Sequence, residues 1–372
     1  MLLYNKRLWL TSIVLLLFGF TLYPQLSRLR QDQPSNFRAA PLEDPFVPDR
    51  TAGHVHKPNT VWEYEWSEHP VGSIRRAINN LGFVESSDTK KQKDDETYRI
   101  LVTGEANIDG WVNNAESFPN RLEMMLNSNS KKPKFEVING AIGRYGPYNY
   151  VGFLRKFLFL KPDMYVVVVY TGNNFSHGLR TAIVRNLVRA PKRPEGFRST
   201  LRKAVSENKM AYYQALQQIH YFKTYPELRA FAVDIAVQQM IEIQRICLTE
   251  GIELVVLTLP TKCDLESDLR PSPCENASET LGLSLEDLEI NKRMAQEFRA
   301  KLNEHGIEVL DLLPAMHGTE EELFWEKDYH LNQRGHDVAA LSFFDQFGAR
   351  VLRPHRLENR RLANGAMHSD AE

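Results

Sequence analysis

The chain has 372 residues, with 46 Lys or Arg and 47 Asp or Glu, so its formal net charge is −1. This even balance gives no reason to predict a nucleic-acid partner, because such partners require a strongly basic surface. The 20 glycines and 19 prolines exclude a fibrous or wholly disordered chain. We expect one large α/β domain with appendages.

Residues 8–23 form an apolar run that follows Lys6 and Arg7. As a helix this run is about 24 Å long, which is short for a membrane span of about 20 residues. No small-residue cleavage site follows it, which favours an uncleaved signal anchor over a cleaved secretion signal. We therefore predict that residues 1–30 are a signal anchor or signal peptide, with a body outside the cytoplasm in either case.

The segments that flank the main body have distinct patterns. Residues 31–60 are polar and rich in proline, which predicts a flexible tether. Residues 61–97 begin with the alternating stretch Val61–Trp66 and are predicted to be an N-terminal extension that packs against the main sheet. Residues 353–372 are charged and are predicted to be a disordered tail.

Residues 98–352 alternate between strand and helix patterns. After the first strand, which starts at Tyr98, strands are expected at 135–139, 164–170, 252–259 and 307–311, and helices at 116–126, 148–160, 227–250, 284–305 and 335–352. Alternation of this kind implies a mostly parallel sheet with helices on both faces, a three-layer α/β/α sandwich.

An insertion at residues 176–228 interrupts this alternation. The stretch from Arg180 to Lys203 within it is rich in Lys and Arg. One interpretation is a basic lid that recruits an acidic polymer or a membrane face. The other is an ordinary pair of helices with solvated charges, and the sequence leaves both open.

The chain has 3 cysteines. Cys263 and Cys274 share one loop and are able to form a disulfide, which suits an oxidising compartment. Cys247 lies in a helical pattern and is expected to be a buried thiol. We find no metal-ligand spacing and no glycine-rich phosphate loop, so no metal or cofactor is predicted.

Candidate site residues occur in four stretches, three of them after predicted strands and one just before the last predicted helix. In Asp328-Tyr-His330, a carboxylate next to an imidazole can orient a general base. In Thr171-Gly-Asn-Asn174, Asn173 can donate a hydrogen bond to a developing oxyanion. In Asn139–Gly146, the backbone of Gly143 or Arg144 can approach a substrate closely. Gly104-Glu105-Ala106 is the turn that ends the first strand, where α/β proteins often present reactive groups.

These blocks, in this order across roughly residues 80–350, resemble the SGNH/GDSL hydrolase family. The resemblance implies a flavodoxin-like α/β/α fold and ester hydrolysis or O-acyl transfer, with an acylated carbohydrate or lipid ester as ligand. It implies that His330 is the base, Asp328 its partner, and Asn173 with Gly143 or Arg144 the oxyanion donors. Gly104 belongs to the block that carries the nucleophile. An envelope or lumenal glycan is the expected substrate source.

The first block departs from the family pattern. Ala106 stands where the family has its nucleophilic serine, and a methyl group cannot form an acyl-enzyme. Three hypotheses follow: a ligand-binding protein that has lost turnover, an active enzyme in which His330 activates water, or an engineered inactive form of a serine esterase. The sequence does not predict an oligomeric state.

Overall fold

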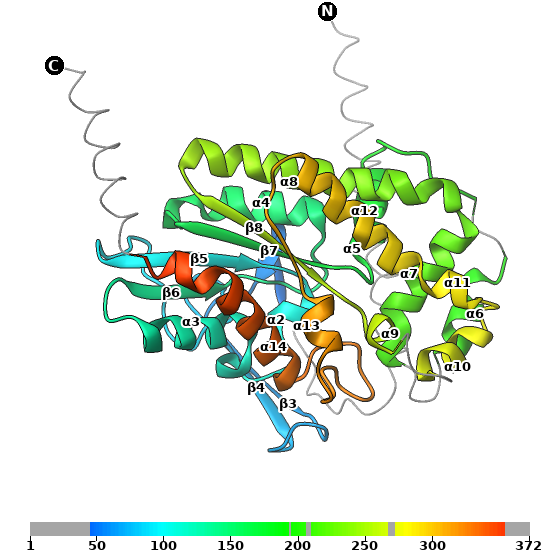
Figure 1. Cartoon of the computed structure of the whole chain (residues 1–372), viewed down its shortest axis with the longest axis horizontal. Helices are drawn as coiled ribbons and strands as arrows, with labels where there is room; N and C mark the ends of the chain where they lie inside the picture. Colours follow the sequence, from blue (N-terminus) through cyan, green and yellow to red (C-terminus); the bar gives the residue numbers. More distant parts are fainter. Residues whose placement is uncertain (1–44, 193–194, 206–209, 267–271, 354–372) are drawn as a thin grey trace, which may run out of the picture. The chain divides into compact units, whose positions relative to one another are not determined.

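The central sheet of the computed structural model has five strands in the order β6-β5-β7-β8-β9, and every neighbouring pair is parallel. The model describes residues 45–192, 195–205, 210–266 and 272–353 (Figure 1). The strands are β5 (Thr97–Thr103), β6 (Lys134–Asn139), β7 (Met164–Tyr170), β8 (Glu253–Leu259) and β9 (Val309–Asp311). The predicted α/β fold with a mostly parallel sheet is thus confirmed.

Helices cover both faces of this sheet, and each face has its own hydrophobic core. Leu101 of β5 and Val167 of β7 pack into one core, whereas their neighbours Ile100 and Val168 pack into the other. This division follows from the alternation of side chains along a strand. The first core includes side chains of α4 (Pro147–Phe157), α5 (Asn174–Val184), α7 (Tyr213–Thr224), α8 (Arg229–Glu250) and α12 (Ile290–Glu304), and the second those of α3 (Phe118–Asn129) and α14 (Gln333–Phe343).

Two hairpins precede the main sheet. The first pairs β1 (Phe46–Asp49) with β2 (Gly53–His56), and the second pairs β3 (Thr60–Glu65) with β4 (Ser73–Ile78). The prediction of a flexible tether is therefore wrong for residues 46–56, because Pro48 and the polar residues around it lie in a two-stranded sheet and its turn. Thr60, the last residue of the predicted tether, already belongs to β3. Residues 31–44 of that prediction lie outside the described residues.

Some helices are shorter than the sequence patterns indicated. The helix predicted at 284–305 is divided into α11 (Leu285–Leu288), which Ser284 caps, and α12. The last predicted helix becomes α14, a π-helical segment (Phe344–Gly348) and α15 (Ala349–Val351). The other α-helices in the described part of the chain are α2 (Ala106–Asp109), α6 (Phe197–Ala204), α9 (Lys262–Leu265), α10 (Pro273–Glu279) and α13 (Leu313–His317).

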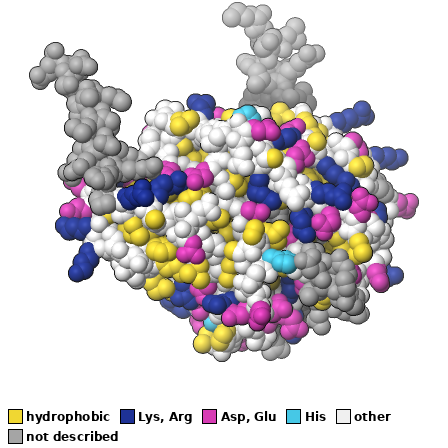
Figure 2. All heavy atoms as spheres, in the orientation of Figure 1, with side chains coloured by type: hydrophobic (Ala, Val, Ile, Leu, Met, Phe, Trp, Pro, Cys, Tyr) yellow, Lys and Arg dark blue, Asp and Glu magenta, His cyan; other side chains and the backbone are white. Residues whose placement is uncertain are grey.

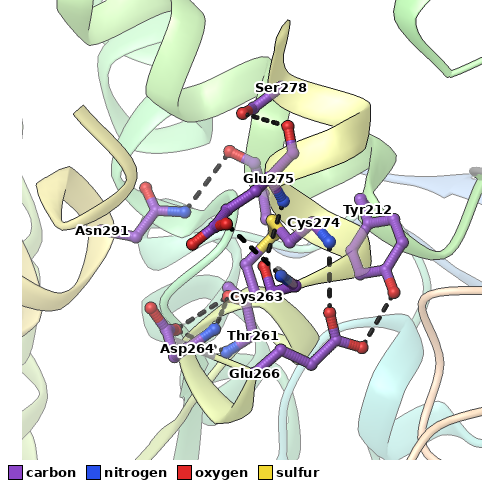
Figure 3. Close-up of a disulfide and its surroundings, with 11 residues drawn as sticks. Tyr212, Thr261, Cys263, Asp264, Glu266, Cys274, Glu275, Ser278 and Asn291 are labelled. Carbon is purple, nitrogen blue, oxygen red and sulfur yellow. Dashed lines mark hydrogen bonds between the residues drawn. A yellow bond between two sulfur atoms is a disulfide. The ribbon is translucent and has the colours of Figure 1, made fainter. Parts of the chain in front are cut away.

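The disulfide between Cys263 and Cys274 is formed, with the two Cα atoms 5.5 Å apart (Figure 3). It joins α9 to α10. Cys247 is buried as predicted, and burial raises the pKa of its thiol to about 12. No helix within the described ranges is long and apolar enough to cross a membrane. The apolar run at 8–23 and the tail after residue 353 lie outside those ranges.

Candidate active site

The candidate site lies where the carboxyl ends of β5, β6 and β7 meet. The strand order reverses between β5 and β7, and in open parallel sheets ligands bind at this kind of switch point. Gly104 comes directly after β5 and packs closely against α2, since a Cβ atom on Gly104 would lie 3.0 Å from Ile108 of α2. The glycine thereby lets α2 start directly at the sheet edge.

Ala106 is the first residue of α2, and its side chain is partly exposed. Glu105 caps this helix by accepting hydrogen bonds from the backbone N–H and the side-chain Nδ2 of Asn107, at 2.9 and 2.8 Å. Burial raises the pKa of Glu105, although the nearby His330 and the bonds from Asn107 act in the opposite direction. The carboxyl group that replaces the family's aspartate therefore points inward and serves as a helix cap.

His330 and Asp328 form the predicted pair. The Nδ1 atom of His330 contacts Asp328 Oδ1, which also accepts the His330 backbone N–H at 2.9 Å. The backbone N–H of Leu331 donates to Asn107 Oδ1 at 3.0 Å, which ties this stretch to the Ala106 turn. His330 Nε2 is buried and has no hydrogen-bond partner among the described residues. The imidazole is thus oriented by a carboxylate, and its outer nitrogen is free.

Asn173, predicted as an oxyanion donor, already uses its amide within the protein. Its Nδ2 donates to Gln214 Oε1 of α7 at 2.8 Å. Its Oδ1 accepts from Asn174 Nδ2 at 2.7 Å, and Asn174 Oδ1 accepts from the Tyr150 hydroxyl at 2.6 Å. A ligand that binds Asn173 must share or replace the contact with Gln214.

Gly143 lies beside Ala106, because a Cβ atom built on Gly143 would be 3.8 Å from the Ala106 methyl group. The Gly143 N–H donates to Asp109 Oδ2 at 3.0 Å, so this predicted donor is occupied. Arg144 is exposed and has a φ of 70°, and within the described part of the chain its N–H makes no hydrogen bond. Of the two candidates, the Arg144 N–H is the one that the fold leaves free.

Asp109 is the centre of a buried cluster that the sequence did not reveal. Its Oδ1 contacts Arg76 and lies 2.9 Å from His56 Nε2. Burial alone would raise the pKa of Asp109, but the charge of Arg76 and the contact with His56 outweigh burial and lower it. Asp109 is three residues after Ala106, whereas His56 and Arg76 come from the two hairpins, so no local spacing could have identified the cluster.

Aromatic side chains surround His330. Trp111 lies 5.6 Å from the His330 ring and stacks on Trp66 at 5.4 Å, measured between ring centroids. Tyr64 approaches Trp111 at 5.1 Å. The alternation of β3 places Tyr64 on its less exposed face. The β3–β4 hairpin therefore contributes an apolar wall beside the His–Asp pair.

Two wider properties bear on the possible chemistry. No group of three or more His, Cys, Asp or Glu side chains in the described residues is arranged to hold a metal ion. Figure 2 shows Lys and Arg interspersed with Asp and Glu on the visible face.

The arrangement of Ala106, His330 and Asp328 can position a proton acceptor beside an ester, but it supplies no attacking hydroxyl.

Comparison with known families identifies one match. Residues 224–363 match the family model described as the SGNH hydrolase-like domain of the acetyltransferase AlgX. This part of the chain is therefore similar to an SGNH hydrolase-like domain. The matched stretch contains Asp328 and His330 but begins after Ala106 and Asn173. Those two positions rest on the resemblance of their own sequence blocks and on the geometry above.

Solved structures with a similar fold include hydrolases of low sequence identity. An acetyl xylan esterase, AlAXEase, is 10% identical over 67% of this chain and 98% of its own, with a TM-score of 0.41. A catalytic mutant of Axe2, an acetylxylan esterase from Geobacillus stearothermophilus, is 10% identical over 68% and 94%, with a TM-score of 0.40. A GDSL-like lipase from Bacteroides thetaiotaomicron VPI-5482 is 10% identical over 68% and 88%, with a TM-score of 0.35.

No curated protein sequence matches the chain. The structural likenesses have TM-scores below 0.5 and identities far below 25%, so they say nothing about activity. The SGNH hydrolase-like domain suggests esterase or acyltransferase chemistry, and the substrate has to be argued from the site.

Proposed function

We propose that this protein binds an acylated carbohydrate or lipid ester in an SGNH hydrolase-like site and has lost most or all ester turnover. The observation that carries the proposal is Ala106 at the first residue of α2, in the turn after β5. A serine there would present its hydroxyl to the substrate, whereas a methyl group offers no nucleophile.

The surroundings of Ala106 support this proposal. His330 Nε2, the atom that would accept a proton from a serine hydroxyl, is buried and lacks a hydrogen-bond partner in the described structure. Two predicted oxyanion donors are occupied by the protein's own oxygens, with Asp109 on Gly143 and Gln214 on Asn173. A site in this state suits the holding of an ester better than the stabilisation of a tetrahedral intermediate.

The test is a paired assay of the protein and its Ala106→Ser variant with 4-nitrophenyl acetate. We expect no turnover above background from the parent. We expect measurable turnover from Ala106→Ser, because the His330–Asp328 pair is already in place to activate a hydroxyl. Adding His330→Ala to the serine variant should abolish the gain. Turnover by the parent that depends on His330 would contradict the proposal.

A second candidate function is favoured by the intact contact between His330 and Asp328. In this alternative, His330 activates a water molecule or an acceptor hydroxyl directly, and the ester is cleaved without an acyl-enzyme. In a serine protease, the oxyanion hole and binding alone leave roughly 10³–10⁴-fold acceleration after loss of the triad. We rank this candidate second because that acceleration is small for an enzyme.

We also propose that the body lies outside the cytoplasm, attached to a membrane through residues 8–23 or secreted after cleavage. The disulfide between Cys263 and Cys274 supports an oxidising compartment. The test is the redox state of these cysteines in protein isolated from its natural host under thiol-blocking conditions. Two free thiols would contradict this location.

A further inference from the structure

Gln214 connects the insertion to the candidate site. It lies in the first turn of α7, and its side chain is partly exposed. Its Oε1 accepts from Asn173 Nδ2 at 2.8 Å, and its side chain also lies close enough to Tyr329, the residue before His330, to act on the pKa of that hydroxyl. One glutamine from the insertion therefore spans two blocks of the site, the turn after β7 and the His330 stretch.

Asn174 fixes the direction of this contact. The family pattern has an aspartate at this position, which could only accept hydrogen bonds when ionised. Asn174 instead donates its Nδ2 to Asn173 Oδ1 at 2.7 Å while its own Oδ1 accepts from Tyr150. Since Asn173 Oδ1 is thereby engaged, Asn173 Nδ2 must face Gln214. Each amide in this chain of bonds orients the next one, which strengthens the series.

Helix α7 is held in place independently of Gln214. One turn later, Gln218 is fully buried, donates to the Thr171 carbonyl at 2.6 Å and accepts the Ser176 N–H at 3.0 Å. The helix also packs against α5 and α12 (Figure 1). Loss of the Gln214 contact is therefore expected to loosen the first turn and to leave the body of the helix docked.

We propose that Gln214 is a specificity-determining residue of this site, one that a ligand must displace from Asn173. Only an oxygen acceptor of similar strength, such as an acyl carbonyl, can replace Gln214 Oε1 without leaving the Asn173 N–H unpaired. A cationic or purely apolar group cannot. Ligand entry therefore exchanges one carbonyl for another and frees the first turn of α7. The ligand part of this proposal rests on the proposed function, which takes the Ala106 site as the binding site.

The contact between Gln214 and Asn173 is tested without any ligand, by hydrogen exchange of the backbone amides in the first turn of α7. Gln214→Ala should speed their exchange about tenfold, because the hydrogen bond from Asn173 is lost. Asn174→Asp should have the same effect, since an ionised aspartate cannot donate to Asn173. Gln217→Ala is the matched control, because Gln217 is exposed on the same helix and its side chain donates a hydrogen bond to the Tyr213 hydroxyl at 3.4 Å rather than to a residue of the site. Unchanged exchange in Gln214→Ala would overturn the proposal.

The ligand part is tested in the Ala106→Ser background with 4-nitrophenyl acetate. Gln214→Ala should lower KM about threefold or more and leave kcat within twofold, because it removes a competitor for Asn173 without touching the reacting atoms. Gln217→Ala should change neither value. An unchanged KM in Gln214→Ala would refute the role in selection. Ala106→Ser could be inert in every background while Gln214→Ala still speeds hydrogen exchange in α7. The structural role of the Gln214–Asn173 contact would then be supported, and both the proposed function and the role of Gln214 in ligand selection would be refuted.

Discussion

At the scale of single residues, the site differs from an ester hydrolase by what Ala106 lacks and by what its neighbours do instead. Glu105 caps α2, Asp109 takes the Gly143 N–H, and His330 keeps its contact with Asp328. In the proposed site, the His330–Asp328 contact is therefore formed, while Ala106 carries no hydroxyl. This asymmetry explains why a single serine is the most informative substitution.

His336 gives a pH-dependent prediction. Burial, together with the charges of His330 and Arg121, lowers its pKa from 6.5 to about 3. Between these values the unfolded chain binds a proton that the folded protein rejects. The free energy of unfolding should therefore fall by about 1.4 kcal/mol for each pH unit below about 6, from this group alone. His336 Nδ1 accepts a hydrogen bond from the Phe118 backbone N–H at 3.0 Å, and an asparagine keeps an acceptor there. Denaturant titrations of the parent and of His336→Asn measure how the free energy of unfolding changes with pH in each.

The control for this prediction is His305→Asn. His305 is exposed, and its replacement should leave the pH slope as in the parent. If His336→Asn also keeps the parental slope between pH 6 and pH 4, the imidazole of His336 is not the group that rejects the proton.

At the scale of elements, the β3–β4 hairpin does more than extend the chain. Its edge docks through two hydrogen bonds between the Ala77 backbone and the Asn114 side chain, at 3.0 and 2.8 Å. From the same strand, Arg76 reaches Asp109. The hairpin thus positions the Asp109 carboxylate, which accepts the hydrogen bond from the Gly143 N–H. It also places Tyr64 and Trp66 beside Trp111.

Arg76→Met is expected to destabilise the fold by about 3–5 kcal/mol, because it leaves the Asp109 carboxylate buried without its main counter-charge. Chemical denaturation measures this change. Adding Asp109→Asn should recover part of the loss, since the uncompensated charge is then removed.

The matched control is Arg293→Met, which breaks the exposed ion pair with Glu286 and should cost less than about 1 kcal/mol. Equal losses in the two single variants would show that Arg76 contributes no more than a surface charge.

At the scale of the whole molecule, two hydrophobic cores enclose one parallel sheet. Their buried members extend from Ala52 to Val351, so the first hairpin and the last helices belong to the same folding body as the sheet. The connections that carry Ala106, Gly143 and Asn173 all leave the sheet at its carboxyl edge. The position of the site therefore follows from the strand order rather than from any single loop.

A shortened chain of residues 44–372 is expected to unfold in one cooperative transition, because all the buried residues of both cores are retained. Circular dichroism and tryptophan fluorescence should report the same Tm. A second chain, shortened to residues 61–372, lacks Ala52 and Val55 of the core and should melt at a lower temperature. Equal melting temperatures would mean that the first hairpin contributes nothing to stability.

The sequence alone determined the strands, the parallel α/β/α class and the resemblance of the blocks around Asn173 and His330. These features follow from local periodicity and from residues that lie close together in the chain. The sequence patterns missed the hairpin at 46–56, because two short polar strands leave a weak pattern. They also left open whether Gly143 or Arg144 offers its N–H.

Only the tertiary structure shows that the Gly143 N–H is bonded to Asp109. It also brings His56, Arg76 and Asp109 together, across separations of up to 53 residues. It likewise placed Gln214 of the insertion on Asn173, 41 residues away. The physical reason is that such contacts depend on how hairpins and helices dock against the sheet edge. Hydrophobic periodicity sets which face of an element is buried, but it does not specify which polar side chains meet once the elements have packed.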